Sequence, residues 1–137
     1  MTKVLDKNGN EKLIRSPAQP TFDIVYVIDG GGVAIVTGSK GFLMVDTGCS
    51  ITQWTLIADQ AGAIVIDVKR STYGGFPTTT SIIGGGNKPT LSAVQKNQAA
   101  PSSWTSTLIN AGDVLEFNVD SATTVTRAIL SLTVSRI

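Results

Sequence analysis

The sequence predicts an all-β protein, a two-sheet antiparallel β-sandwich with jelly-roll-like topology and an extended N-terminal arm. Three observations lead to this prediction. Short runs rich in β-branched and aromatic residues recur from residue 22 onward. Glycines, 14 in all, stand between these runs and indicate many turns. The 137 residues, 42% hydrophobic and 15% charged, suffice for a single core and exclude a disordered chain.

We predict that residues 1–21 form the arm and that residues 22–137 form the β-sandwich domain. The apolar residues of the arm are few and occur as the pairs "VL" (4–5) and "LI" (13–14). The polar run "KNGNEK" separates these pairs, and the prolines of "SPAQP" follow them. This composition is typical of a linker or arm and not of a packed core.

The segment "FDIVYVID" (22–29) begins the predicted sandwich. It carries apolar residues on both of its alternating faces. A strand of this kind is covered on both sides. We expect the core to cover one face and another subunit to cover the other.

Two hairpins are predicted next. Ser39 and Lys40, between glycines, are expected to turn the chain from "VAIVTG" into "GFLMVD". The segment "DQAG" (59–62) is expected to turn it from "ITQWTLIAD" into "AIVIDVKR". Alternation places two apolar sets inward: Trp54, Leu56 and Ala58, then Ile64, Ile66 and Val68.

The last third of the chain predicts a loop region followed by strands. Residues 73–103 are dense in Gly, Pro, Ser and Thr, and predict loops with one short strand and a helical turn near 91–95. Strands on either side of "NAGD" (110–113) and a final strand follow. Two apolar sets are expected to face inward: Leu115, Phe117 and Val119, then Ala128, Leu130, Leu132 and Val134.

Charge and composition exclude several classes of function. The formal charge of +1, without long runs of one sign, is not typical of a protein that binds nucleic acid. No apolar run is long enough to span a membrane, and the charged N-terminus predicts a chain that is soluble and not secreted by the usual route. The chain has no histidine, and its one cysteine, Cys49, has no partner for a disulfide, so Ser-His and Cys-His nucleophiles are excluded.

One motif resembles a catalytic site. In "FLMVDTGCS" (42–50) an apolar strand runs into Asp46-Thr47-Gly48, the way in which aspartic proteases present a carboxylate. Catalysis would need a homodimer, so that two carboxylates share a proton. The motif is short and the chain already accounts for a full sandwich, so we interpret Asp46 as a turn residue. The dimeric protease remains a remote third hypothesis.

No metal or cofactor site is predicted. The glycine triplets 30–32 and 84–86 are not followed by Lys-Ser/Thr or by a helix, so they are expected to be turns or close backbone approaches. The aspartates do not alternate at the ligand spacing of a calcium loop. We interpret them as solvated turn residues: Asp59, Asp67, Asp113 and Asp120.

The order of several longer segments resembles a module common in tailed-bacteriophage virion proteins. These segments are "YVIDGGGVAIVTGSKGFLMV", "CSITQWTLIADQAGAIVIDVKR", "SIIGGGNKPTLSAVQKNQ" and "WTSTLINAGDVLEFNVDSATTVTRAILSLTV". The resemblance covers about residues 24–134, most of the chain. In the family a proline and an aromatic residue usually precede the cysteine, and "VDTGCSI" departs from that pattern. The module often ends longer tail or fibre proteins.

The resemblance implies a trimeric β-sandwich head with a structural or adhesive role and without catalysis. We expect a capsid decoration, or cement, protein on the virion surface, because so short a chain has no shaft to project a receptor-binding tip. The expected partners are two further copies and the major capsid protein. The arm would contact the shell or a neighbour through Val4, Leu5, Leu13 and Ile14, and the trimer would bury Ile24, Tyr26 and Ile28.

An alternative from another class of function is a tail-fibre tip or receptor-binding head that recognises a host surface glycan. Aromatic side chains in loops are typical sugar-stacking groups. The candidates are Tyr73, Phe76 and Trp104. Trp54 is in phase with Leu56 and is expected in the core.

Overall fold

The computed structural model describes residues 2–5, 7–9, 11–14 and 20–137. These residues form ten strands and every strand pair is antiparallel, so the predicted all-β sandwich is confirmed. The strands are β1 (Thr2–Leu5), β2 (Glu11–Ile14), β3 (Thr21–Asp29), β4 (Gly38–Val45), β5 (Cys49–Ser71), β6 (Thr80–Ser81), β7 (Thr90–Ala99), β8 (Leu108–Ile109), β9 (Asp113–Thr123) and β10 (Arg127–Arg136).

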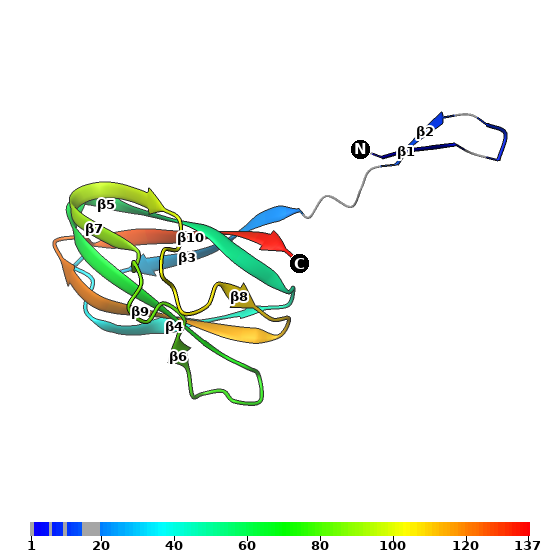
Figure 1. The fold of residues 1–137 in the computed structure, drawn as a ribbon. Helices are drawn as coiled ribbons and strands as arrows, with labels where there is room; N and C mark the ends of the chain where they lie inside the picture. The colour runs from blue at the N-terminus through cyan, green and yellow to red at the C-terminus, as the bar shows by residue number, and fades with distance from the viewer. Residues whose placement is uncertain (1, 6, 10, 15–19) are drawn as a thin grey trace.

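The sandwich is one sheet folded in half, with β5 running through both halves (Figure 1). Residues 49–58 of β5 pair with β10, and residues 63–71 pair with β9. On the far sides, β3 pairs with β10 and β4 pairs with β9. We call β3, β10 and the first half of β5 layer A, and β4, β9 and the second half of β5 layer B. β7 follows β5 along its other edge across both layers.

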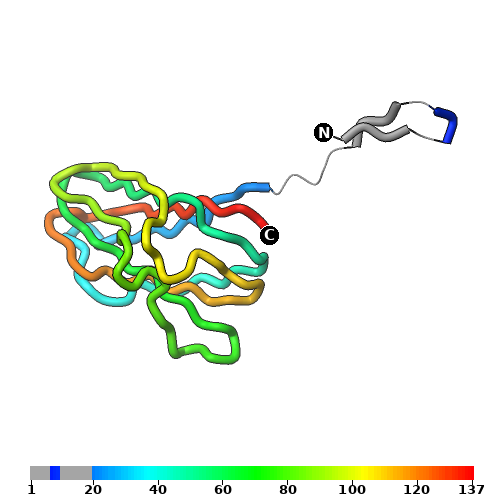
Figure 2. Tube along the Cα trace, viewed as in Figure 1, coloured from blue at the N-terminus to red at the C-terminus, as the bar shows by residue number. Residues whose placement is uncertain are grey.

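The fold between the layers is a corner built by Asp59, Gly62 and residues 123–127. Figure 2 shows the chain turning at this end of the molecule after β3, within β5 and between β9 and β10. The Asp59 carboxylate accepts hydrogen bonds from the Thr126 hydroxyl and from the backbone N–H groups of Thr126 and Arg127. A Cβ on Gly62 would lie 2.8 Å from the carbonyl oxygen of Thr123, so a side chain there would press on the backbone of the next strand.

Both predicted hairpins are wrong, because the chain bends or bulges at these places and does not reverse. "DQAG" lies inside β5 at the corner, where the register of its pairing with β7 shifts. Ser39 and Lys40 lie inside β4, which bulges between Ser39 and Gly41. Glycine signals a change of backbone geometry, and a bulge or bend uses it as readily as a turn does.

The prediction that residues 73–103 are mostly loop, with a helical turn near 91–95, is also wrong. This region contains β7, ten residues long, which pairs with β5. Its sequence "TLSAVQKNQA" is polar because most of these side chains are exposed. A polar strand of this kind at the side of a sheet has no apolar alternation to reveal it.

The core lies between the layers and contains the predicted inward sets. The sets on β5, β9 and β10 are buried apart from Ala58, which is partly buried against the core. Trp54, 2% exposed, is a core residue as expected. Ile82 and Ile83, in the region predicted as loop, also belong to this core.

The predicted arm contains a short hairpin in place of an extended segment. β1 and β2 pair from Thr2↔Ile14 to Leu5↔Glu11 and form a sheet of their own. The predicted arm contacts, Val4, Leu5, Leu13 and Ile14, lie on these strands, but their side chains lie outside the described part of the structure.

Candidate assembly surfaces

Asp46 lies exposed in the connection 46–48 between β4 and β5. An aspartic protease shields its carboxylates so that the pair shares one proton. The exposed position of Asp46 therefore favours our interpretation of it as a turn residue.

Part of the outer face of layer A is apolar and exposed. Val25 and Val27 on β3 are 52% and 55% exposed, and Ile57 on β5 is 42% exposed. Val27, Ile129 and Ile57 stand in register across β3, β10 and β5. We call Val25, Val27, Ile57 and Ile129 the layer A patch. Contiguous exposed apolar side chains of this kind mark interaction surfaces.

The predicted trimer residues lie on the opposite face of the same strand. Ile24 and Ile28 are 6% and 3% exposed within the single chain, so both belong to its own core. The Tyr26 ring packs edge-on against Phe117 at 4.4 Å between centroids, and its hydroxyl donates to the carbonyl oxygen of Lys40 at 2.6 Å. The core of the single chain thus already buries Ile24 and Ile28. Alternation could not show which face of "FDIVYVID" would turn inward, because both faces are apolar.

The predicted glycan residues do not form one group. Tyr73 is 75% exposed and Phe76 is 40% exposed. Trp104 is buried, with its indole N–H bonded to the carbonyl and side-chain oxygens of Asn87, so its assignment as a stacking platform is wrong. Phe76 instead meets Phe42 of β4 edge-on at 4.9 Å, a neighbour that the sequence did not reveal.

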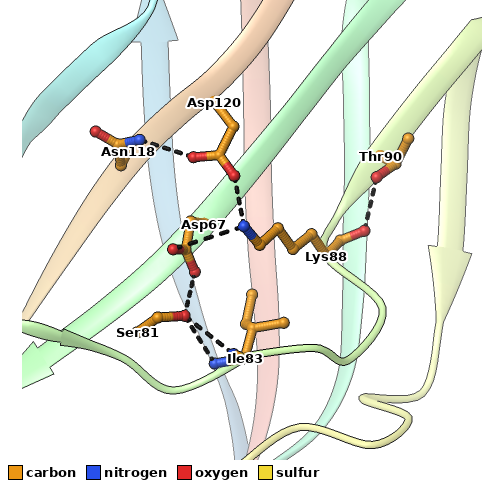
Figure 3. Close-up of polar contacts among 8 residues, drawn as sticks. Asp67, Ser81, Ile83, Lys88, Thr90, Asn118 and Asp120 are labelled. Carbon is orange, nitrogen blue, oxygen red and sulfur yellow. Dashed lines mark hydrogen bonds and ion pairs between the residues drawn. The ribbon is translucent and has the colours of Figure 1, made fainter.

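The outer face of layer B holds a polar cluster around Asp67 and Lys88 (Figure 3). Asp67, only 6% exposed, accepts a hydrogen bond from the Ser81 hydroxyl at 2.6 Å. The Lys88 ammonium lies 3.8 Å from Asp67 and 2.6 Å from Asp120, which also accepts a bond from Asn118. The bond to Asp120 raises the pKa of Lys88 above its ordinary value. The cluster thus satisfies its own charges and ties the segment before β7 to the sheet.

The other aspartates singled out in the sequence also bond within the chain. Asp113, 3% exposed, accepts from the backbone N–H of Asn110 and pairs with Arg70 at 3.7 Å. Asp59 holds the corner. Within the described residues, no group of three or more His, Cys, Asp or Glu side chains is placed to hold a metal ion. That part of the chain also contains no helix with the length and hydropathy to cross a membrane.

A groove of about 300 Å³ separates β3 from β4. These two strands end the sheet order β3-β10-β5-β9-β4, so neither has a strand partner on its groove side within the described residues. At one end Tyr26 reaches across to Lys40 and closes the gap. Gly41 makes this possible, because a Cβ there would collide with the Tyr26 hydroxyl. No local sequence pattern indicates this groove, because it depends on how the sheet folds.

No family model matches this chain. No curated protein matches it either. Among solved structures, one described as the structure of infectious bursal disease virus Gx strain is similar, with 16% identity and a TM-score of 0.35. The similarity covers 86% of this chain, which spans 30% of the length of that one. We draw nothing further from this similarity, because a TM-score this low does not establish a shared fold.

Proposed function

We propose that the protein is a non-enzymatic structural component of a tailed-bacteriophage virion, a capsid decoration (cement) protein that binds the outside of the shell as a homotrimer. The layer A patch is the observation that carries this proposal. It gives the sandwich an exposed apolar surface in register across three strands.

The patch suits a contact between identical copies. Its centre is aliphatic, and polar side chains of Thr55, Asn97 and Gln98 stand beside Ile57. An apolar centre with a polar rim is the usual anatomy of a protein interface. In the proposed trimer the patch takes the place of Ile24 and Ile28, which the core already uses. The three-fold symmetry comes from the sequence resemblance.

The proposal is tested by the copy number of the protein in purified virions, measured against the major capsid protein. A decoration protein is expected in a near-stoichiometric ratio. A handful of copies would place the protein in the tail and overturn the decoration role. Complete absence from virions would overturn the structural role altogether.

A receptor-binding head is the second candidate, favoured by the exposed side chain of Tyr73 and by the exposed pair Phe76 and Phe42. Exposed rings stack on sugar faces, and the edge-on contact between Phe76 and Phe42 holds that pair in place. Under this hypothesis the wild-type protein binds a bacterial glycan on an array and Tyr73→Ala loses that binding. Trp104→Phe is the matched control, because Trp104 is buried. An array without binding would remove this candidate.

A further inference from the structure

The groove between β3 and β4 has the form of a site for an added strand. It is lined by Phe22–Val25 of β3 and by residues 43–47 that end β4 and enter the next turn. Neither β3 nor β4 has a strand partner on this side in the described part of the chain. Unpaired edges bind extended segments by backbone hydrogen bonds, with side-chain pockets providing specificity.

The chemistry of the groove is apolar and acidic. Its aliphatic lining includes Val25, Leu43 and Met44. Asp23 and Asp46, both exposed, are the two charged residues among the nine that line it, and no basic residue is among them. A fitting occupant is therefore an extended segment with apolar residues beside a lysine or arginine.

The N-terminal hairpin of this chain has that chemistry. β1 is "TKVL" and β2 is "EKLI", so each strand contains a lysine followed by two apolar residues. Each is four residues long, the length of the groove wall Phe22–Val25. Residues 1–20 carry four Lys or Arg against two Asp or Glu, which makes them complementary in sign to the groove. Among the described residues the hairpin forms a two-stranded sheet apart from the main sheet, and the edges of such a sheet are sites for strand addition.

We propose that the β1–β2 hairpin of one copy docks in the β3–β4 groove of a neighbouring copy, with Lys3 or Lys12 near Asp23 and Asp46. This inference deepens the proposed function and rests on it, since it requires an assembly of identical copies. A contact of this kind joins two different surfaces, and copies related by a three-fold rotation would close it into a ring.

Charge-swap variants of the full chain test the contact. Sedimentation equilibrium is measured for Asp23→Lys/Asp46→Lys and for Lys3→Glu/Lys12→Glu. Each pair places like charges together, so the association constant of each variant alone is expected to fall roughly tenfold to a hundredfold. The variant with all four changes has the wild-type net charge and opposite signs across the contact again. It is expected to recover association to within about threefold of the wild type.

Mixing separates docking between copies from docking within one chain. The two double variants, each weak alone, are expected to associate when combined, because the hairpin of each variant meets a groove of opposite charge on the other variant. In a ring of three copies two of the three contacts are matched in this way, so mixing is expected to restore association in part and the fourfold variant to restore it further. Unchanged association in both double variants would overturn the proposal. Loss of association that neither mixing nor the fourfold variant restores would also overturn it, as would docking of the hairpin on its own chain.

The test is separable from that of the proposed function. Copy number in virions decides the decoration role whichever surface joins the copies. If the charge swaps have no effect while the protein is abundant on virions, the hairpin contact is wrong and the decoration role stands. If the swaps behave as expected while the protein is absent from virions, the contact is right and the decoration role is wrong.

Discussion

The two halves of β5 carry two different outer faces. In the first half, Ile57 points outward beside Ile129 and Val27, and these three side chains form an apolar row. In the second half, Asp67 points outward beside Asn118 of β9, under Lys88. One strand therefore contributes an exposed apolar surface to layer A. To layer B it contributes a polar surface whose hydrogen-bonding and charged groups have partners within the chain.

Under the proposed function, this difference separates a surface that a partner covers from one that stays in water. The charges of layer B find their partners within the chain, so covering that face would gain little apolar burial and would remove charged groups from solvent. The four side chains of the layer A patch carry no polar atoms, so covering them removes only apolar surface from water. Layer B also carries two exposed apolar side chains on β4, Phe42 and Met44. Met44 lines the groove, and Phe42 contacts Phe76.

Ile57→Lys is expected to give the largest effect on this contrast. A charge at the centre of the layer A patch would have to be buried without a partner on trimer formation. We expect the dissociation constant of the proposed trimer, measured by sedimentation equilibrium, to rise at least about thirtyfold, or about 2 kcal/mol. The melting temperature of the isolated chain is expected to change little, because Ile57 is already 42% exposed.

Val36→Lys is the control for that variant. Val36 is more exposed, at 67%, but lies in the connection between β3 and β4 and not on the patch. Its association is expected to match the wild type. Equal trimer stability in Ile57→Lys and the wild type would mean that the layer A patch is not the interface.

Lys88→Met removes the cation of the polar cluster on layer B. It is expected to lower the free energy of unfolding and to leave association between copies unchanged. Without the ammonium, Asp67 keeps the bond from Ser81 but stays buried as a charge with no cation beside it. We expect a loss of about 2–3 kcal/mol in the free energy of unfolding, measured with urea. Lys96→Met, at an exposed position on β7, is expected to change it by less than about 0.5 kcal/mol. An effect of Lys88→Met as small as that of Lys96→Met would contradict a stabilising role for the cluster.

The fold class could be predicted from sequence because alternation fixes which side chains share a face. Leu115, Phe117 and Val119 are all buried, as the pattern "LEFNV" indicates. The path of the chain could not be predicted, because "DQAG" serves a bend in a continuous strand as well as it serves a turn. Contacts more than sixty residues away decide between a bend and a turn, because the backbone N–H groups of Thr126 and Arg127 bind the Asp59 carboxylate at the corner.

The candidate surfaces were harder to predict than the core for a related reason. In "FDIVYVID" alternation separates Ile24 and Ile28 from Val25 and Val27, but both sets are apolar. Only the packing of β3 against the other layer decides which set faces inward. The groove depends on two strands whose unpaired edges come together after folding, which no local pattern indicates.

Gly62→Ala tests the corner where the two faces of β5 meet. The added Cβ would lie 2.8 Å from both the Thr123 carbonyl oxygen and a methyl carbon of Val125. Because backbone and a buried side chain would have to shift, we expect a loss of about 1–3 kcal/mol in the free energy of unfolding. Gly85→Ala is the control, since no atom lies within 4 Å of a Cβ there. Equal stability of the two variants would show that the corner tolerates a side chain.

Glu116→Gln is expected to give the smallest effect, and it is measured as a change in how stability depends on pH in acid. On the outer face of layer B, hydroxyl groups of Thr79 and Ser39 donate to Glu116, and the bond from Thr79 is the main cause that lowers the pKa of this carboxyl. A lowered pKa in the folded state gives stability that is present above the unfolded value, about 4.3, and is lost as the pH falls through the folded value. Urea unfolding of the wild type is therefore expected to weaken below about pH 5, and the variant is expected to show a flatter dependence. Between neutral and acid pH, the wild type is expected to lose at most ~1 kcal/mol more of its free energy of unfolding than the variant, because Glu116 is partly solvated. Identical slopes of unfolding free energy against pH would mean that the hydroxyl groups of Thr79 and Ser39 bind the protonated and the ionised Glu116 equally well. Glu116 would then not contribute to the loss of stability in acid.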